Sequence, residues 1–219
     1  MSRPRKGQGP PRYVGVDPGQ KGFICVVDER CEIVAMWPIP YLEKRVDTAK
    51  LSKMFKALMI RNVRFVYLEE QHAFHREGPA GAFTNGDGFG CLRTALAMTG
   101  LRHEIIKPEV WKRNAEIPVP NVPKAKLPPK PVLKGTTKKA KAKLAAWKKK
   151  CKTITDRRSR AVTAKRKELS CRKAQSLQPG YDFRSSARAK KPHDGKCEAF
   201  LLAREAWKLE RRANPRSRR

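Results

Sequence analysis

The sequence predicts an α/β layer fold, in which a mixed five-stranded sheet carries helices on both of its faces. Runs rich in β-branched residues and amphipathic helical patterns follow one another in the order three strands, helix, strand, helix, strand, helices. The first three runs lie close enough in sequence to form an antiparallel meander. With 219 residues, 39% of them hydrophobic, the chain is long enough to bury one ordinary core.

The first half of the chain supplies the clearest elements. The run RYVGVD is followed by a Pro/Gly turn, and the runs GFICVVDE and CEIVAMWPI complete the meander. The next segment predicts an amphipathic helix, because its apolar residues recur at i, i+3, i+4 and i+7. These residues are Leu51, Met54, Phe55 and Leu58. Asp47 is a suitable N-cap for that helix, and VRFVYLE then predicts a buried strand that ends on Glu69.

The second half is predicted to be mainly helical. A polar, Gly-rich loop from His72 to Gly86 leads into the helix FGCLRTALAMTG, for which Gly100 is a natural C-terminal stop. The run LRHEIIK predicts the fifth strand, and PEVWKRN begins a helix with proline in its first turn. Two further helices are expected, one with Asp156 as its cap and one in PHDGKCEAFLLAREAWKLERR.

Composition divides the chain into regions. We predict a basic leader at 1–12, a single domain made of 13–116 and 156–212, a flexible Lys/Pro-rich insertion at 117–155, and a basic tail at 213–219. The insertion contains no Asp or Glu, and its Pro-Lys runs cannot bury enough apolar surface to fold alone. Two roles remain open for it: an arm that adds salt-sensitive affinity for DNA, or a localisation signal or an adaptation to a ribonucleoprotein partner.

The net charge of +31, from 51 Lys and Arg against 20 Asp and Glu, makes nucleic acid the leading partner, well ahead of an anionic membrane. No apolar run is long enough to span a bilayer, and the first residues lack an apolar signal core. Six cysteines are scattered without a C-x-x-C pair and are interpreted as reduced thiols. We therefore expect an intracellular protein, in the cytoplasm or nucleoid of a host, in an organelle or in the nucleus.

Four acidic residues in this basic chain predict a metal site. Asp17 ends the first strand and Glu69 the fourth, while Asp194 and Glu198 share one face of the last helix. Bare carboxylates would repel a phosphodiester, whereas Mg²⁺, with Mn²⁺ as a substitute, prefers oxygen ligands and reverses the local charge. Each acid alone has an ordinary interpretation as a turn residue, a helix cap or a surface ion pair. Together, at strand ends, they favour two-metal phosphodiester hydrolysis.

Five motifs in the same order resemble the RuvC-type Holliday junction resolvases of the RNase H-like superfamily, in particular their phage-type and plant organellar branch. These motifs are VGVDPGQKG, VYLEEQHAF, FTNGDGFGCLRTALAMTG, KPEVWKR and KPHDGKCEAFLLA. The resemblance implies an RNase H-like fold and a homodimer that cuts four-way DNA junctions, with each subunit nicking one of two symmetric strands. It implies that Asp17, Glu69 (rather than Glu70), Asp194 and Glu198 are catalytic metal ligands, with His193 as an auxiliary.

Other residues are candidates for DNA binding. Phe74 and Phe83 lie in the loop after Glu69, where an aromatic ring can stack on an unpaired base, although Phe83 is equally suited to anchoring the loop. Gly86 and Gly88 are predicted to form a phosphate cradle before a helix N-terminus. The remaining candidates are cationic or near the last helix: Lys107, Lys112, Arg113, Lys191 and His193. Trp111, beside Lys112, is interpreted as core packing.

Two functions of different classes fit these patterns. The first is a metal-dependent, structure-selective endonuclease that resolves four-way DNA junctions. The second is a non-catalytic nucleic-acid-binding protein of the same fold, in a nucleoprotein or ribonucleoprotein assembly. A binding protein has no need to keep four carboxylates, so their presence favours the enzyme. An actin-like or sugar-kinase-like ATPase also begins with a strand followed by Asp and Gly, but it requires a much longer chain.

Overall fold

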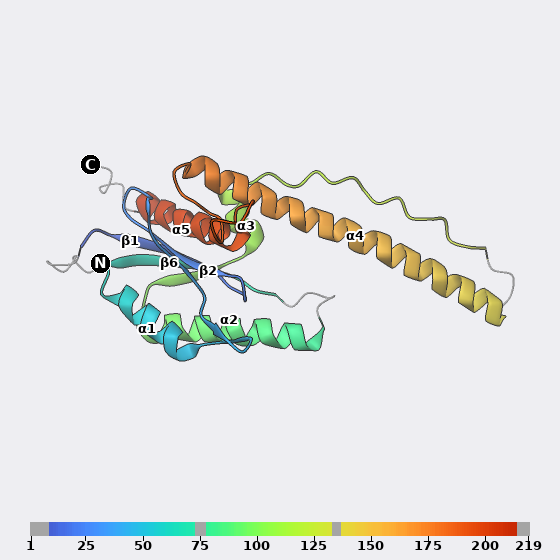
Figure 1. Ribbon diagram of the computed structural model, residues 1–219, viewed down its shortest axis with the longest axis horizontal. Helices are drawn as coiled ribbons and strands as arrows, with labels where there is room; N and C mark the ends of the chain where they lie inside the picture. The colour runs from blue at the N-terminus through green and yellow to red at the C-terminus, as the bar shows by residue number, and fades with distance from the viewer. Residues whose placement is uncertain (1–8, 73–77, 133–136, 214–219) are drawn as a thin grey trace. The chain divides into compact units, whose positions relative to one another are not determined.

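The main sheet has five strands in the order β3-β2-β1-β6-β7 (Figure 1). The strands are β1 (Arg12–Asp17), β2 (Phe23–Val27), β3 (Ile33–Pro38), β6 (Val63–Glu69) and β7 (His103–Ile106). β1, β2 and β3 pair antiparallel, whereas β1, β6 and β7 pair parallel. The predicted mixed five-stranded sheet is therefore confirmed. This is a computed structural model, and it describes residues 9–72, 78–132 and 137–213.

Within the part of the chain that the structure describes, five helices accompany the sheet. They are α1 (Thr48–Met59), α2 (Pro79–Thr99), α3 (Pro108–Asn114), α4 (Lys138–Leu177) and α5 (Asp194–Ala213). As the sequence predicts, the Asp47 side chain caps α1 by accepting a hydrogen bond from the Lys50 backbone N–H. Gly100 ends α2 in the left-handed conformation. A short hairpin of β4 (Tyr41–Leu42) and β5 (Arg45–Val46) precedes α1 and was not predicted.

The two faces of the sheet carry separate apolar clusters. Val14 and Val16 of β1 lie in the cluster that α1 and α2 cover, whereas Tyr13 lies in the cluster that α5 covers. This alternation follows from the two-residue period of a strand. Figure 1 shows α1 and α2 on one side of the sheet and α5 on the other. The sheet is thus buried on both faces, as in other α/β layer folds.

Gly15 allows β1 and α5 to approach very closely. A Cβ atom placed on Gly15 would meet the backbone of α5 at 2.2 Å, at both the Ala199 oxygen and the Ala203 nitrogen. Only a residue without a side chain fits such a contact. This packing brings the first strand against the helix that carries Glu198.

Two helices begin earlier than the sequence indicates. The predicted loop from His72 to Gly86 is wrong in its second part, because α2 begins at Pro79 and Gly86 lies within the helix. Gly78 serves as an extended N-cap, and proline at the first helical position is preorganised for a helix. The helix expected from Asp156 begins at Lys138 instead. Lys, Ala and Leu dominate its first turns, and all three favour helix.

The chain divides into two compact units. One comprises residues 1–117 and 170–219 and contains every strand that the structure describes. The other comprises residues 118–169, and its described parts are the Pro-rich segment 118–132 and the first part of α4, from Lys138. This second unit ends later than the predicted insertion at 117–155, because α4 runs without a break through the predicted boundary. The flexibility of the insertion stays a prediction.

Candidate active site

Three of the four predicted acids meet at the carboxyl ends of two interior strands, β1 and β6. Asp17 ends β1, Glu69 ends β6, and Glu198 lies in the second turn of α5. Because β1 and β6 are parallel neighbours, their carboxyl ends lie side by side. One carboxylate oxygen of each residue lies within 4.8 Å of those of the other two. All three side chains are buried.

Neighbouring polar groups hold two of the carboxylates in place. The indole Nε1 of Trp111 donates a hydrogen bond of 3.0 Å to Glu69 Oε1. The hydroxyl of Ser170 donates one of 3.0 Å to Glu198 Oε1, and Lys112 Nζ lies 2.9 Å from the same oxygen. The site is therefore formed by side chains from β1, β6, α3, α4 and α5.

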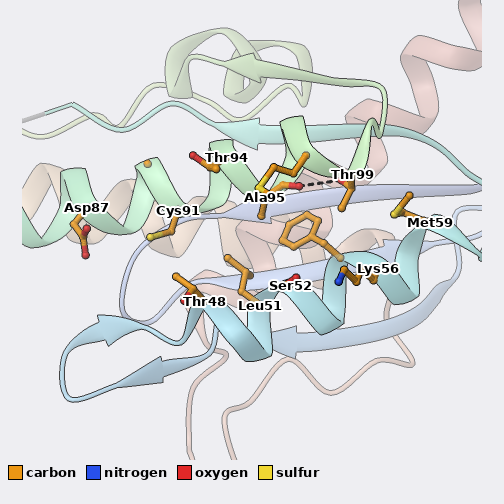
Figure 2. Close-up of a pocket in the computed structure, with 13 residues that line it drawn as sticks. Thr48, Leu51, Ser52, Lys56, Met59, Asp87, Cys91, Thr94, Ala95 and Thr99 are labelled. Carbon is orange, nitrogen blue, oxygen red and sulfur yellow. Dashed lines mark hydrogen bonds between the residues drawn. The ribbon is translucent and has the colours of Figure 1, made fainter.

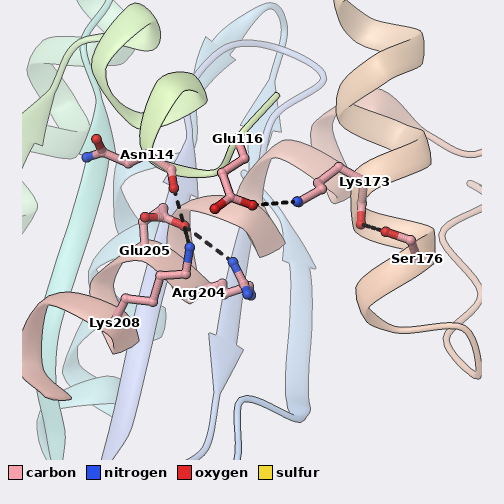
Figure 3. Close-up of polar contacts among 7 residues, drawn as sticks. All are labelled: Asn114, Glu116, Lys173, Ser176, Arg204, Glu205 and Lys208. Carbon is pink, nitrogen blue, oxygen red and sulfur yellow. Dashed lines mark hydrogen bonds and ion pairs between the residues drawn. The ribbon is translucent and has the colours of Figure 1, made fainter. Parts of the chain in front are cut away.

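Polar contacts tie α3, which supplies Trp111 and Lys112, to its neighbours (Figure 3). Lys208 on α5 donates a hydrogen bond to the Asn114 carbonyl at the end of α3 and pairs with the buried Glu205 at 2.8 Å. Lys173 on α4 pairs with Glu116, just after α3, at 3.3 Å. These contacts join α3 to α4 and to α5.

Burial and repulsion between carboxylates raise the pKa values of Asp17 and Glu69. Burial, followed by repulsion from Glu69 and Glu198, raises the pKa of Asp17 well above its usual range. Burial and Glu198 also raise the pKa of Glu69, against the opposing effects of Lys112 and the Trp111 hydrogen bond. Burial lowers the pKa of Lys112, but Glu198 and Glu69 outweigh it, so the net shift is upward. Lys112 is therefore held in its charged form.

The donor set fits a hard divalent cation. Three buried carboxylates supply oxygen atoms only, and Mg²⁺ and Mn²⁺ prefer oxygen ligands. With all three acids ionised and Lys112 charged, an excess of negative charge remains in a buried place. A divalent ion offsets that charge, so Asp17, Glu69 and Glu198 are the residues that would hold it.

Comparison with known proteins connects this geometry to one fold. No protein-family model matches the sequence, and no curated protein matches it. A structure of Thermus thermophilus RuvC in complex with a Holliday junction substrate matches with a TM-score of 0.52 and 13% identity, covering 93% of this chain and 96% of that chain. A second T. thermophilus RuvC structure matches with a TM-score of 0.50 and 12% identity, covering 91% and 95%. The fold is of the RuvC type. The predicted phage-type and plant organellar branch stays a prediction.

In this RuvC-type fold, Asp194 is outside the group of three. It is the first residue of α5, its side chain is 33% exposed, and its Oδ1 lies 3.9 Å from His193 Nδ1. The negative charge of Asp194 contributes a small part of the rise in the Asp17 pKa. The imidazole of His193 packs edge-on against Phe23, with 5.0 Å between ring centroids. The metal role of Asp194 and the auxiliary role of His193 stay predictions.

The predicted position of Gly86 and Gly88 before a helix N-terminus is wrong, and their role in nucleic-acid binding stays a prediction. Gly86 and Gly88 lie inside α2, seven and nine residues after its start, so neither backbone N–H group is among the free donors of a helix N-terminus. Gly88 instead permits close packing, since a Cβ there would lie 3.0 Å from the Tyr41 hydroxyl. Phe83 is exposed on α2, where its side chain is 68% accessible. Phe74 lies outside the described residues.

The cationic candidates divide into two kinds. Lys107, Arg113 and Lys191 are exposed, and their phosphate-binding roles stay predictions. Lys112 is only 22% exposed and pairs with Glu198, so it belongs to the carboxylate cluster. The interpretation of Trp111 as core packing was incomplete, because the buried ring also donates to Glu69.

A separate groove lies between α1 and α2 (Figure 2), and none of Asp17, Glu69 and Glu198 lines it. Its volume is about 610 Å³, and Leu51, Phe55, Ala95 and Met98 contribute apolar surface to it.

Among the described helices, none has both the length and the apolar character needed to cross a membrane.

The stability of the metal-free protein should depend on pH through Asp17 and Glu69. Both have raised pKa values in the folded state, so the folded protein binds more protons than the unfolded chain above their usual pKa values. Their contribution to the free energy of unfolding is therefore complete at low pH and is lost as the pH rises through the raised values. Thermal unfolding in a chelator, from about pH 5 to about pH 8, measures this.

The double variant Asp17→Asn/Glu69→Gln isolates the effect of these two groups. Its melting temperature should fall less than that of the wild type as the pH rises, because neither replacement titrates. Added Mg²⁺ or Mn²⁺ should stabilise the wild type increasingly at higher pH, since the ligands must be deprotonated to bind. Parallel pH profiles for the two proteins in chelator would contradict the assignment.

Trp111→Phe should weaken divalent metal binding by roughly 10- to 100-fold, the usual effect of losing a group that orients a ligand. The phenyl ring keeps most of the packing but removes the N–H that fixes Glu69. Calorimetric titration with Mn²⁺ measures the change. Trp207→Phe is the matched control, because its indole N–H donates to the Glu29 carbonyl on the surface. Equal Mn²⁺ affinity in both variants would count against an orienting role.

Proposed function

We propose that this protein is a metal-dependent, structure-selective endonuclease that resolves four-way DNA junctions. The observation that carries the proposal is the convergence of Asp17, Glu69 and Glu198 in a chain with a net charge of +31. The overall positive charge of the protein attracts nucleic acid. A buried cluster of acids does not contribute to that attraction and needs another explanation, such as metal binding. Metal-assisted phosphodiester hydrolysis explains both features.

The RuvC-type fold supports the choice of substrate. The T. thermophilus RuvC structure with a TM-score of 0.52 is a complex with a Holliday junction. At 13% identity the activity does not follow from the fold, so the carboxylates carry that part of the argument. We propose that the protein acts as a homodimer whose subunits each hydrolyse one phosphodiester bond, in two symmetric strands.

The residues of this chain have distinct tasks in the proposed reaction. Asp17, Glu69 and Glu198 would hold Mg²⁺ or Mn²⁺, and the ion would supply stabilisation of the charge that develops on the attacking and leaving oxygens. Trp111 fixes the orientation of the Glu69 carboxylate, and Ser170 that of Glu198. These hydrogen bonds preorganise the site before the substrate arrives.

A nicking assay on synthetic four-way junctions tests the proposal. Each strand is labelled in turn, and the junction is incubated with the protein in Mg²⁺, in Mn²⁺ or in chelator. We expect paired, symmetric nicks that require the metal, and far fewer on linear duplexes of the same sequence. If the protein binds junctions of varied sequence yet cuts none in either metal, the non-catalytic binding protein becomes the better description.

A further inference from the structure

Residues 118–169 form a unit with an unusual charge. They contain 18 of the Lys and Arg residues and only two acids, Asp156 and Glu168. About half of the net charge of the chain is therefore concentrated in less than a quarter of its length. The predicted site uses none of these residues, so their role requires a separate explanation.

The unit combines a helix with an extended segment. Half-buried residues of α4 recur at intervals of three and four: Ala140, Leu144, Trp147, Cys151 and Ile154. In the segment 120–131, the half-buried residues recur at intervals of two or three: Pro120, Val122, Ala125, Pro128 and Pro131. A period near three is typical of a polyproline II helix. Each stretch thus has one face that is less exposed than the others.

Two side-chain hydrogen bonds join the helix to the extended segment. The indole Nε1 of Trp147 donates to the Pro128 carbonyl at 3.0 Å, and Arg158 Nε donates to the Pro123 carbonyl at 3.1 Å. Proline removes backbone donors but leaves carbonyls, which such side chains can satisfy. The two stretches therefore form a defined pair within the unit.

The remaining faces of the helix are basic and exposed. Lys141, Lys148 and Lys152 are all exposed and are spaced by seven and four residues, which places them on one side of α4. Lys148 and Lys152 are also like charges at i, i+4, a spacing that destabilises an isolated helix. A polyanion lying along this side would relieve the repulsion.

We infer that this unit, in its described residues 118–132 and 137–169, is a preformed arm that binds the phosphate backbone of straight duplex DNA without reading its sequence. This inference rests on the proposed function, because it takes DNA as the substrate. The helical part, from Lys138 to Leu169, is about 48 Å long at 1.5 Å per residue. Duplex DNA of that length, about 14 base pairs, carries roughly 28 phosphate charges.

The composition of the arm favours duplex over single-stranded DNA. Proteins that bind single strands use aromatic platforms on which bases stack. The arm has a single aromatic residue, Trp147, and its ring is half-buried with its N–H bonded to Pro128. The arm would therefore bind through contacts of lysine and arginine with phosphates. Such contacts do not depend on the base sequence of the DNA.

Charge removal in the full-length protein tests the arm. The variant Lys141→Gln/Lys148→Gln/Lys152→Gln removes three positive charges and keeps good helix formers. The matched control, Lys50→Gln/Lys53→Gln/Lys56→Gln, removes three exposed lysines from α1. Binding to a linear duplex of about 20 base pairs is measured over a range of salt concentrations, with circular dichroism to verify the helix content. The arm variant should lose about two to three units from the slope of log affinity against log salt, and the control less than one.

Nicking of the four-way junction separates the two proposals. At low salt and saturating protein, the arm variant should nick at the wild-type rate. If no protein nicks but the slopes differ as expected, the proposed function fails and the arm stands. If nicking is normal and the arm variant keeps the wild-type slope, or loses no more than the α1 control, the arm inference is wrong. A larger loss of affinity for double-stranded RNA than for DNA would also overturn it.

Discussion

Asp17→Asn is expected to reduce nicking of a four-way junction by at least about a thousandfold, while junction binding stays within about threefold of wild type. Asn has the shape of Asp but lacks the charge that a divalent ion requires. The loss should not come from unfolding, because burial and then repulsion from Glu69 and Glu198 raise the pKa of Asp17, so that a neutral side chain is favoured there. Without metal, the variant should therefore melt at or above the wild-type temperature near neutral pH.

Substitutions of two other acids show whether the loss of nicking is specific to the three clustered carboxylates. Glu198→Gln should reduce nicking to a similar extent, whereas Glu70→Gln should remain close to wild type. Glu70 follows Glu69 directly but lies outside the group of three, with its carboxylate 3.5 Å from the His72 ring. Single-turnover nicking in saturating Mg²⁺, with binding measured separately in Ca²⁺, compares the variants. Wild-type nicking by Asp17→Asn would remove the basis of the proposed function.

Gly15→Ala should destabilise the protein by about 3 kcal/mol or more, which is at the upper end of the cost of overpacking. The added methyl group would lie 2.2 Å from backbone atoms of α5, and backbone cannot move aside as a flexible side chain can. β1 and α5 would have to separate. Denaturant unfolding measures the change in midpoint.

Gly90→Ala is the matched control for this substitution. Gly90 lies within α2, and nothing approaches within 4 Å of the position that its Cβ would take. Alanine there should stabilise the helix by about 0.5 to 1 kcal/mol, since glycine is the poorer helix former. Equal unfolding midpoints for the Gly15 and Gly90 variants would show that β1 and α5 can separate without cost.

The sequence predicted the elements whose signals are local. The strands that end on Asp17 and Glu69 are apolar runs stopped by an acid, and the parallel pairing of β1 with β6 brings those acids together. Glu198 was found through its helical spacing from Asp194. In each case a few neighbouring residues indicate the type of element and the acid that it carries. The order of elements and three of the acids could therefore be predicted.

What the sequence did not reveal depends on contacts between distant segments. Ser170 donates to Glu198 from 28 residues away, and Trp111 donates to Glu69 from 42 residues away. No local pattern distinguishes these two side chains from others on their helices. The predicted loop at Gly86 and Gly88 is wrong for the opposite reason: two glycines so close together indicate a loop locally, yet both lie within α2, where Gly88 packs against Tyr41. Tertiary context often overrides weak propensity in this way.

The continuity of α4 has a consequence for the order of Ser170, which orients Glu198. A shorter chain that joined Ile117 directly to Ser170 would place Ser170 in the first turn of a helix, where backbone N–H groups lack intrahelical partners and ends fray. The hydroxyl that orients Glu198 would then sit on the least ordered part of the helix. Deleting residues 118–169 should therefore also loosen the hydroxyl that orients Glu198, unless a new N-cap precedes Ser170.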